Sequence, residues 1–117
     1  MNNLNIGIIR KSEYVLISVE GDLDLEGAAE LKALLKRDFS IEDSVPQDFS
    51  HLVIDFSGAG AVSSSGIGLL ASLQRSFNNS KKKMTLVKIP DPLRQSLIVT
   101  RLIGVFRICD DLAEAIR

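Results

Sequence analysis

Three consecutive serines, residues 63 to 65, lie between two apolar stretches of the sequence. A serine hydroxyl in such a place can cap a helix, attack a substrate as a nucleophile, or accept a phosphoryl group from another protein. The first turn of a helix has unpaired N–H groups and a positive dipole end, so a phosphate there is locally favoured. A phosphate would also add a charge of about −2 to a nearly neutral surface, and such a charge can abolish docking of a partner.

Nucleophilic catalysis by these serines is the interpretation that the sequence disfavours. A turn that presents a nucleophilic serine needs a glycine two residues before the serine and two residues after it. Ser64 has Gly66 after it but Val62 before it, and Ser65 has neither glycine. The only histidine, His51, should lie at the other end of the preceding strand, roughly 20 Å away and beyond hydrogen-bond reach. The glycines of this region also lack the spacing of a phosphate-binding loop, so we predict that the chain is not an enzyme.

A purely structural role remains open for the serine triplet. Ser63 can be the N-cap of a helix, with its oxygen accepting an amide proton from the first turn. Ser64 and Ser65 would then occupy solvent-exposed positions of that turn. The sequence alone leaves this role beside the alternative that a serine here is modified by another protein.

Hydrophobic periodicity predicts the elements that must position the serines. Strands are expected at 5–9, 14–20, 51–56, 84–89 and 105–108, and helices at 25–39, 64–77, 93–100 and 111–116. Helices between successive strands imply right-handed crossovers and a mostly parallel sheet, while the first two strands form an antiparallel hairpin. We therefore predict a single α/β domain over residues 1–117, with a mixed, mostly parallel sheet flanked by about four helices.

Breaks in the periodicity predict the segments between these elements. Residues 21–24 should end the second strand, with Asp24 as the N-cap of the first helix, and residues 58–61 should form a tight passage. Asp110 should cap the last helix. Residues 40–50 contain a proline and have no sustained period, so we expect a loop there. That loop is either a tolerated surface insertion or a contact for a particular partner.

Composition restricts the environments and ligands that the chain can have. The sequence is 45% apolar and 25% charged, and it has no apolar run long enough for a membrane span. Its first residues lack the pattern of a signal peptide, so we expect no secretion. We therefore expect a cytoplasmic protein without membrane insertion. A net charge of −1 and the lack of tryptophan give no footprint for nucleic-acid binding.

The lone reactive side chains are expected to be structural. The single cysteine, Cys109, excludes an internal disulfide, and with the single histidine it leaves no zinc-binding set. We expect Cys109 to be a small buried hydrophobe and His51 to be an ordinary strand-entry residue. The only basic cluster, Lys81 to Lys83, is expected to be a solvated turn. No metal or cofactor is therefore predicted.

Two segments, HLVIDFSGAGAVSSSGIGLLASLQRSF and KKMTLVKIPDPLRQSLIVTRL, carry a recognisable order of motifs. This order, which spans nearly the whole chain, resembles the STAS domains of bacterial anti-sigma factor antagonists. In that family a hydrophobic strand ends in Asp and leads through a short loop to Asp-Ser-Ser-Gly-Leu-Gly and a helix. The segment from Gly21 to Asp24 likewise resembles the family's Gly-Glu/Asp-Leu-Asp motif, and Asp24 and Asp55 match its acidic positions. The family's fold agrees with the one that periodicity predicts.

The resemblance implies a chain that is switched by phosphorylation. In the family, an anti-sigma factor that is also a serine kinase phosphorylates the serine after the motif's Asp, and only the unphosphorylated antagonist binds it and releases sigma. That serine corresponds to Ser64, and a PP2C-type phosphatase would reverse the modification. The implied partner-binding positions are Asp24, Ser63, Ser64, Ser65, Gly66 and Gly68.

Ser63 departs from the family, which usually has Asp before the phosphorylated serine. A serine caps a helix as an aspartate does, but it has neither the negative charge nor the two acceptor oxygens of a carboxylate. Modification is therefore slow at Ser64, shifted to Ser63, or absent. The alternative function is that of a STAS scaffold without phosphorylation, as a subunit of a lipid-transport system or of a stress-signalling complex.

Overall fold

A five-stranded mixed sheet organises residues 4–117, the part of the chain that the computed structural model describes. The strands are β1 (Asn5–Arg10), β2 (Val15–Leu23), β3 (His51–Val62), β4 (Lys83–Val87) and β5 (Arg107–Cys109). The helices are α1 (Leu25–Phe39), α2 (Ser64–Asn79), α3 (Asp91–Val99) and α4 (Leu112–Ala115), with a 3₁₀ turn at Ile103–Val105. Residues 1–3, the start of the segment predicted to lack a leader, lie outside the described part.

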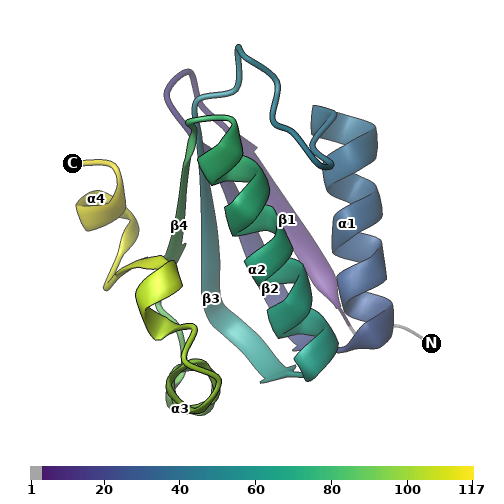
Figure 1. Cartoon of the computed structure of the whole chain (residues 1–117), viewed down its shortest axis with the longest axis vertical. Helices are drawn as coiled ribbons and strands as arrows, with labels where there is room; N and C mark the ends of the chain where they lie inside the picture. The colour runs from purple at the N-terminus through teal and green to yellow at the C-terminus, as the bar shows by residue number, and fades with distance from the viewer. Residues whose placement is uncertain (1–3) are drawn as a thin grey trace.

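The strands follow one another across the sheet in sequence order. β1 runs antiparallel to β2, and every later neighbour is parallel (Figure 1). The predicted fold class is therefore confirmed: a mostly parallel sheet with an antiparallel hairpin at its amino-terminal edge, flanked by four helices.

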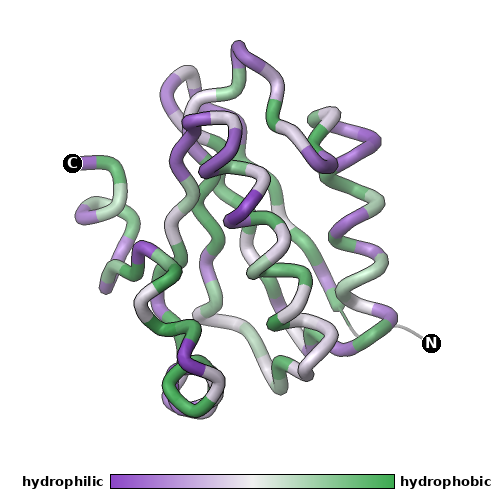
Figure 2. The backbone as a smooth tube through the Cα atoms, viewed as in Figure 1, coloured by the Kyte–Doolittle hydropathy of each residue, from purple (hydrophilic) through white to green (hydrophobic). Residues whose placement is uncertain are grey.

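The two faces of the sheet are covered unequally. α1 and α2 lie side by side on one face (Figure 1), where Leu31, Leu35 and Leu70 share a buried core with Ile17 and Ile54. In Figure 2 hydrophobic and hydrophilic residues alternate along α1, as expected of a helix with one buried face. α4 packs on the opposite face through a smaller cluster: Leu16, Val53, Val87, Cys109 and Ala115. Cys109 is buried there, as the sequence predicts.

β2 and β3 continue where the sequence predicted breaks, so both predicted breaks are wrong. β2 runs through residue 23 and β3 through residue 62. The pairing passes from Ser18 with Asp55 to Glu20 with Gly58, so β3 advances by one residue more than β2, and a second such shift follows. These bulges keep the glycine-rich segment extended and paired. Alternation of apolar residues does not reveal a bulged strand, because the extra residue reverses the pattern.

The ends of other elements also differ from the predicted ones. β4 ends before Lys88, whose left-handed φ of 55° turns the chain. The predicted strand at 105–108 is divided between the 3₁₀ turn and β5, because a short apolar run does not distinguish a strand from a helical turn. Asp111, not Asp110, caps α4 by accepting a hydrogen bond from a first-turn N–H at 2.8 Å. By contrast, α1 has the predicted bounds, and Asp24 is its N-cap.

The segment 40–50 is a loop, as predicted, but it is packed into the fold. Its buried apolar side chains are Ile41, Val45 and Phe49. The Ser76 hydroxyl of α2 donates to the Glu42 carbonyl at 2.8 Å, and the Ser80 hydroxyl accepts a hydrogen bond from Val45 N at 2.9 Å. The loop therefore completes the core above α2.

Candidate functional site

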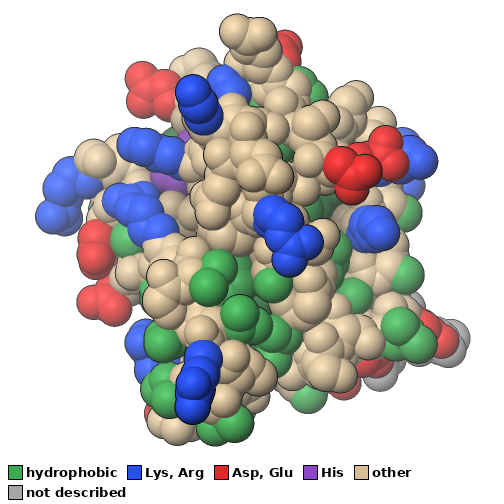
Figure 3. All heavy atoms as spheres, viewed as in Figure 1, with side chains coloured by type: hydrophobic (Ala, Val, Ile, Leu, Met, Phe, Trp, Pro, Cys, Tyr) green, Lys and Arg blue, Asp and Glu red, His purple; other side chains and the backbone are tan. Residues whose placement is uncertain are grey.

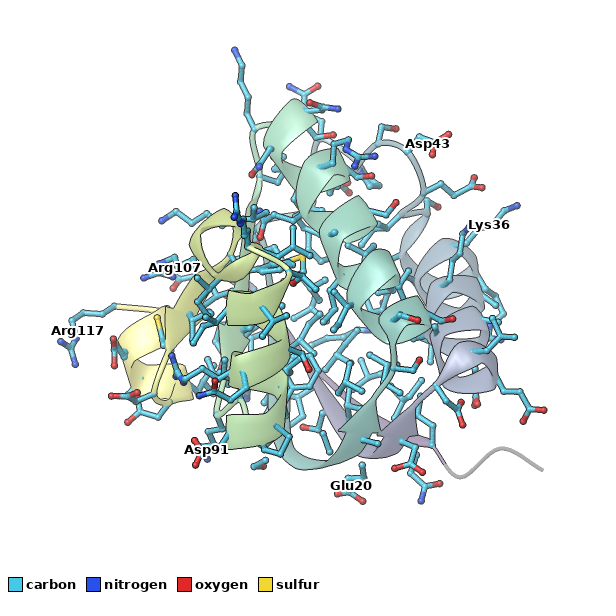
Figure 4. The ribbon with its side chains drawn as sticks, turned by 60° about the horizontal axis from the view of Figure 1, so that its bottom comes forward. Glu20, Lys36, Asp43, Asp91, Arg107 and Arg117 are labelled. Carbon is cyan, nitrogen blue, oxygen red and sulfur yellow. The ribbon has the colours of Figure 1, made fainter. Side chains whose placement is uncertain are left out.

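The serine triplet lies where the strands β2 and β3 finish, at the end of the sheet formed by the carboxyl ends of its parallel strands. We call this end, and the one at which β3 and β4 begin, the two edges of the sheet. β3 leads into α2 and β2 leads into α1, and the pairing of Leu23 with Val62 places the starts of the two helices side by side. Figure 4 brings this edge forward, with Glu20 and Asp91 labelled along it. The fold thus brings Asp24 close to residues 63–68, which are distant in the sequence.

Ser63 is the N-cap of α2, as the sequence predicts, and its hydroxyl is fully engaged. Its Oγ accepts a hydrogen bond from Gly66 N at 3.3 Å and donates to the Leu23 carbonyl, also at 3.3 Å. The Ser63 backbone N–H donates to the same carbonyl at 3.0 Å. Ser63 therefore joins the start of α2 to the end of β2, and modification of its oxygen would disrupt the two hydrogen bonds of the hydroxyl.

Ser64 is the opposite case, an exposed serine with an unengaged hydroxyl. Within residues 4–117 its Oγ makes no hydrogen bond. The backbone N–H groups of Ser64 and Ser65 lie in the first turn of α2, where no carbonyl of the helix reaches them. An anion on the Ser64 oxygen would therefore lie at the positive end of the helix, next to unpaired donors.

Two shallow grooves flank the first turn of α2. The groove between α2 and α3 has a volume of about 380 Å³, and Ser64 lies in its wall beside Ile67 and Val99. Val99 is 79% exposed. The groove between α1 and α2 has a volume of about 300 Å³, with Ser65 and Gly68 in its wall. Figure 3 shows hydrophobic side chains gathered beside α2 and α3, so Ser64 lies within an exposed surface that is partly apolar.

The two glycines of the predicted site have different reasons to be glycine. A Cβ atom at Gly66 would overlap the Leu23 carbonyl oxygen, so the close approach of α2 to β2 requires a residue without a side chain. A Cβ atom at Gly68 would meet nothing within 4 Å, and Gly68 is exposed. Packing therefore accounts for Gly66 and leaves Gly68 unexplained.

Asp22 is a residue of this edge whose role sequence reasoning missed. Its Oδ1 accepts a hydrogen bond from Ala61 N at 2.9 Å, at the second register shift between β2 and β3. At the first shift, Asp55 Oδ1 accepts from Ser57 N at 2.7 Å. The spacing of Asp22 and Asp24 around one apolar residue was the available signal. These carboxylates bind backbone N–H groups. Among residues 4–117 no group of three His, Cys, Asp or Glu residues could hold a metal ion.

His51 lies at the opposite edge, at the first residue of β3. It is buried, and its Nε2 lies 2.8 Å from Thr85 Oγ1. Burial is the main cause that lowers the pKa of His51 from 6.5 to about 4, and the charges of Arg107 and Lys83 add to it. Burial likewise raises the pKa of the Cys109 thiol. Neither side chain is placed to act on Ser64.

A comparison with family models decides which family this arrangement represents. The model of the STAS domain matches residues 5–115. The chain belongs to the STAS domain family. The matched range of the STAS domain includes all five strands, the serine triplet and Asp24.

Solved structures share the STAS fold over nearly the whole chain. The anti-sigma factor antagonist from Mycobacterium paratuberculosis is 22% identical, with a TM-score of 0.78 over 97% of this chain and 91% of that one. The Bacillus cell fate determinant SpoIIAA in its phosphorylated form is 18% identical, with a TM-score of 0.71 over 96% of each chain.

The STAS fold also occurs as a part of larger proteins. The murine anion transporter Slc26a9 is 16% identical, with a TM-score of 0.72, and the match covers 92% of this chain but 18% of the transporter. Within residues 4–117 of the present STAS domain, no helix is long and apolar enough to cross a membrane. At these identities the structural likeness shows the fold.

Proposed function

We propose that this STAS domain is an anti-sigma factor antagonist that binds a serine-kinase anti-sigma factor through the first turn of α2 and is switched off by phosphorylation of Ser64. The observation that carries the proposal is the contrast between two adjacent serines. Ser64 is exposed and unengaged, whereas the Ser63 hydroxyl caps α2 and binds the Leu23 carbonyl. The likeness to two anti-sigma factor antagonists, one of them in its phosphorylated form, supports the same function.

The same contrast favours Ser64 over Ser63 as the modified residue. A phosphoryl group on Ser63 would remove a cap and a cross-strand hydrogen bond, each of which contributes about 1 kcal/mol. A phosphoryl group on Ser64 disrupts no hydrogen bond of the hydroxyl, and its negative charge interacts favourably with the positive end of the α2 dipole. Phosphate at Ser64 would lie in the groove between α2 and α3, where its charge would repel a docked partner and resist desolvation.

The proposal places the chain in a partner-switching role without catalysis of its own. The kinase uses ATP, so the modified chain would be cytoplasmic, and a PP2C-type phosphatase would restore the binding form. The proposed partner-binding positions are Asp24, Ser63, Ser64, Ser65, Gly66 and Gly68. Asp24 and Gly66 would act by shaping the edge, since their own contacts are with α1 and β2.

A STAS scaffold without phosphorylation is the second candidate, and the absence of a carboxylate at residue 63 favours it. In the family that the chain resembles, this position usually carries an aspartate, which could interact with the metal or arginine of a kinase. Ser63 keeps the cap but lacks that charge. The likeness to the STAS region of a transporter is consistent with this candidate.

Capture of the native partner, followed by a phosphorylation assay, tests the proposal. The full chain serves as bait in extracts of its own cells, and a protein with an ATP-binding kinase domain is the expected partner. With that kinase and ATP, intact-mass measurement should show one added phosphate on the wild type and on Ser12→Ala, an exposed control. Ser64→Ala should gain none. An active kinase that leaves the wild type unmodified would establish the scaffold instead.

A further inference from the structure

A second cluster of polar side chains lies at the edge of the sheet opposite Ser64. A cavity of about 260 Å³ opens there between the last turns of α2, the start of β4 and the start of β5. Its polar lining side chains are Gln74, Asn78, Lys82, Lys83 and Arg107. We call this the basic cavity.

The charged groups of the basic cavity all have one sign. Three of its lining residues are cationic, and none of its lining residues is acidic. Figure 3 shows the Lys and Arg side chains gathered around the single histidine, on the side where β4 begins. Cations that line a hollow without a compensating carboxylate attract an anion more strongly than scattered surface lysines do. Lys82 and Lys83, which the sequence predicts to lie in a solvated turn, therefore line this cavity.

Two of the three cations are held in place by the fold. Arg107 Nη1 donates to Thr85 Oγ1 at 2.9 Å and to the Ala115 carbonyl at 2.8 Å, and within residues 4–117 its Nη2 and Nε donate to no acceptor. Lys82 Nζ donates to the Gln47 carbonyl at 2.5 Å. A guanidinium that is anchored through one nitrogen presents the rest of its fork in a defined direction, which suits an oxyanion.

Gln74, one of the lining residues of the basic cavity, carries an unsatisfied acceptor that is itself buried. It is 6% exposed, and its Nε2 donates to Asn78 Oδ1 at 2.9 Å. Its Oε1 is the one buried side-chain polar atom among residues 4–117 that has no hydrogen-bond partner. A buried acceptor without a partner destabilises the structure. A ligand hydroxyl group that reaches this oxygen through a rotation of the Gln74 amide would supply the missing donor.

We propose that the basic cavity binds a small phosphorylated compound that also carries a hydroxyl group. Phosphate suits the site because it carries up to two negative charges and three acceptor oxygens, which match an arginine and two lysines. The hydroxyl group supplies the donor that Gln74 Oε1 lacks. The volume admits a compound of a few carbon atoms. This site lies at the other edge from Ser64 and needs no protein partner, so it stands or falls independently of the proposed switch.

The single histidine offers an internal reporter of anion binding. His51 shares Thr85 Oγ1 with Arg107, and the charges of Arg107 and Lys83 are among the causes that lower its pKa. An anion between these two cations would offset their charge. The pKa of His51 should therefore rise when the basic cavity is occupied.

Nuclear magnetic resonance of the full chain tests the proposal with two probes, glycerol 3-phosphate and inorganic phosphate, at constant ionic strength. The wild type should show saturable shifts of the Gln74 side-chain amide, and the His51 pKa should rise. Glycerol 3-phosphate should bind about fivefold more tightly than inorganic phosphate, because a hydrogen bond to Gln74 contributes about 1 kcal/mol. Lys83→Glu, at an exposed position, should lose at least tenfold in affinity, and Lys11→Glu is the charge-matched control.

A second variant separates the hydroxyl contact from the charge. Gln74→Leu replaces the amide by an apolar group of similar volume and should bind the two probes equally. The proposal is overturned if neither probe binds saturably, if Lys83→Glu binds as the wild type does, or if Gln74→Leu keeps the preference for glycerol 3-phosphate. Binding to vesicles of phosphatidylglycerol, without binding of the soluble probe, would overturn the assignment to a soluble compound and identify a lipid headgroup instead.

Discussion

At the edge where β2 and β3 end, Ser64 exposes an unengaged hydroxyl between two open grooves, while at the opposite edge His51 is buried against Thr85. At the first edge, the carboxylates of Asp22 and Asp55 accept hydrogen bonds from backbone N–H groups of β3, and side chains in the first turn of α2 stay accessible. At the second edge the loop 40–50 packs against α2 through hydrogen bonds of its backbone to Ser76 and Ser80, and the basic cavity opens beside the start of β4. The same sheet thus presents an exposed serine at one end and a buried histidine beside a cationic cavity at the other.

Substitution of Ser64 should have the largest effect on partner binding. Ser64→Asp should weaken the complex with the captured kinase by at least about 100-fold, because a charge in a docked interface is both repelled and desolvated. Ser64→Ala should bind like the wild type. Isothermal titration calorimetry measures both affinities. Equal affinities of the two variants would remove the functional difference between the two edges.

The pH dependence of stability should come from the edge that holds His51. The pKa of His51 is lowered from 6.5 to about 4 in the folded chain, so the unfolded chain takes up a proton first as the pH falls. The contribution of His51 to the free energy of unfolding should therefore be fully present above the pKa of the unfolded chain. The free energy of unfolding should fall by about 2–3 kcal/mol from pH 7 to pH 4.5.

Urea unfolding at both pH values measures this loss, with His51→Gln as the comparison. The variant has no imidazole to protonate, so its stability should change less over the same range, since only the carboxylates then contribute. A variant that loses as much stability as the wild type would show that the carboxylates, and not His51, cause the pH dependence.

The two glycines of α2 should respond to alanine in opposite directions. Gly66→Ala should destabilise the fold by about 2 kcal/mol, because its methyl group would overlap the Leu23 carbonyl. Gly68→Ala should stabilise it by about 0.5–1 kcal/mol, because alanine is the better helix former and the space is open.

Urea unfolding measures these changes, and partner affinity separates the two roles. If a partner approaches the groove between α1 and α2 closely, Gly68→Ala should bind several-fold more weakly even though it is more stable. Gly104→Ala, where a Cβ atom also meets nothing, is the matched control and should leave binding unchanged. Unaltered binding of Gly68→Ala would exclude Gly68 from the partner-binding surface.

Introduction of a carboxylate before Ser64 should have a small effect on the fold. Ser63→Asp keeps the N-cap but cannot donate to the Leu23 carbonyl, so stability should fall by no more than about 1 kcal/mol. Phosphorylation of Ser64 by the captured kinase should become several-fold faster, since the carboxylate can interact with a metal or arginine of the kinase. A time course of intact mass measures the rate, and an unchanged rate would show that residue 63 acts only as a cap.

Local patterns were sufficient for the helices and for the fold class. α1 has the predicted bounds because its apolar spacing and the cap by Asp24 are contained within the segment itself. The bulged ends of β2 and β3 were not predictable in the same way. Their extended conformation depends on pairing between two segments, and Asp22 helps to hold it by a hydrogen bond to Ala61 N, a residue 39 positions away.

The sequence by itself determined the order of the elements, the N-caps at Asp24 and Ser63, and the position of a serine-rich first turn, because these depend on neighbours within a few residues. Only the tertiary structure decided which serine is available. Ser63 is engaged because the Leu23 carbonyl at the end of β2 lies beside it, and Ser64 is exposed in the wall of the groove beside α3. Whether a serine hydroxyl is available depends on contacts between distant segments, so two adjacent serines of the same sequence motif can differ in it.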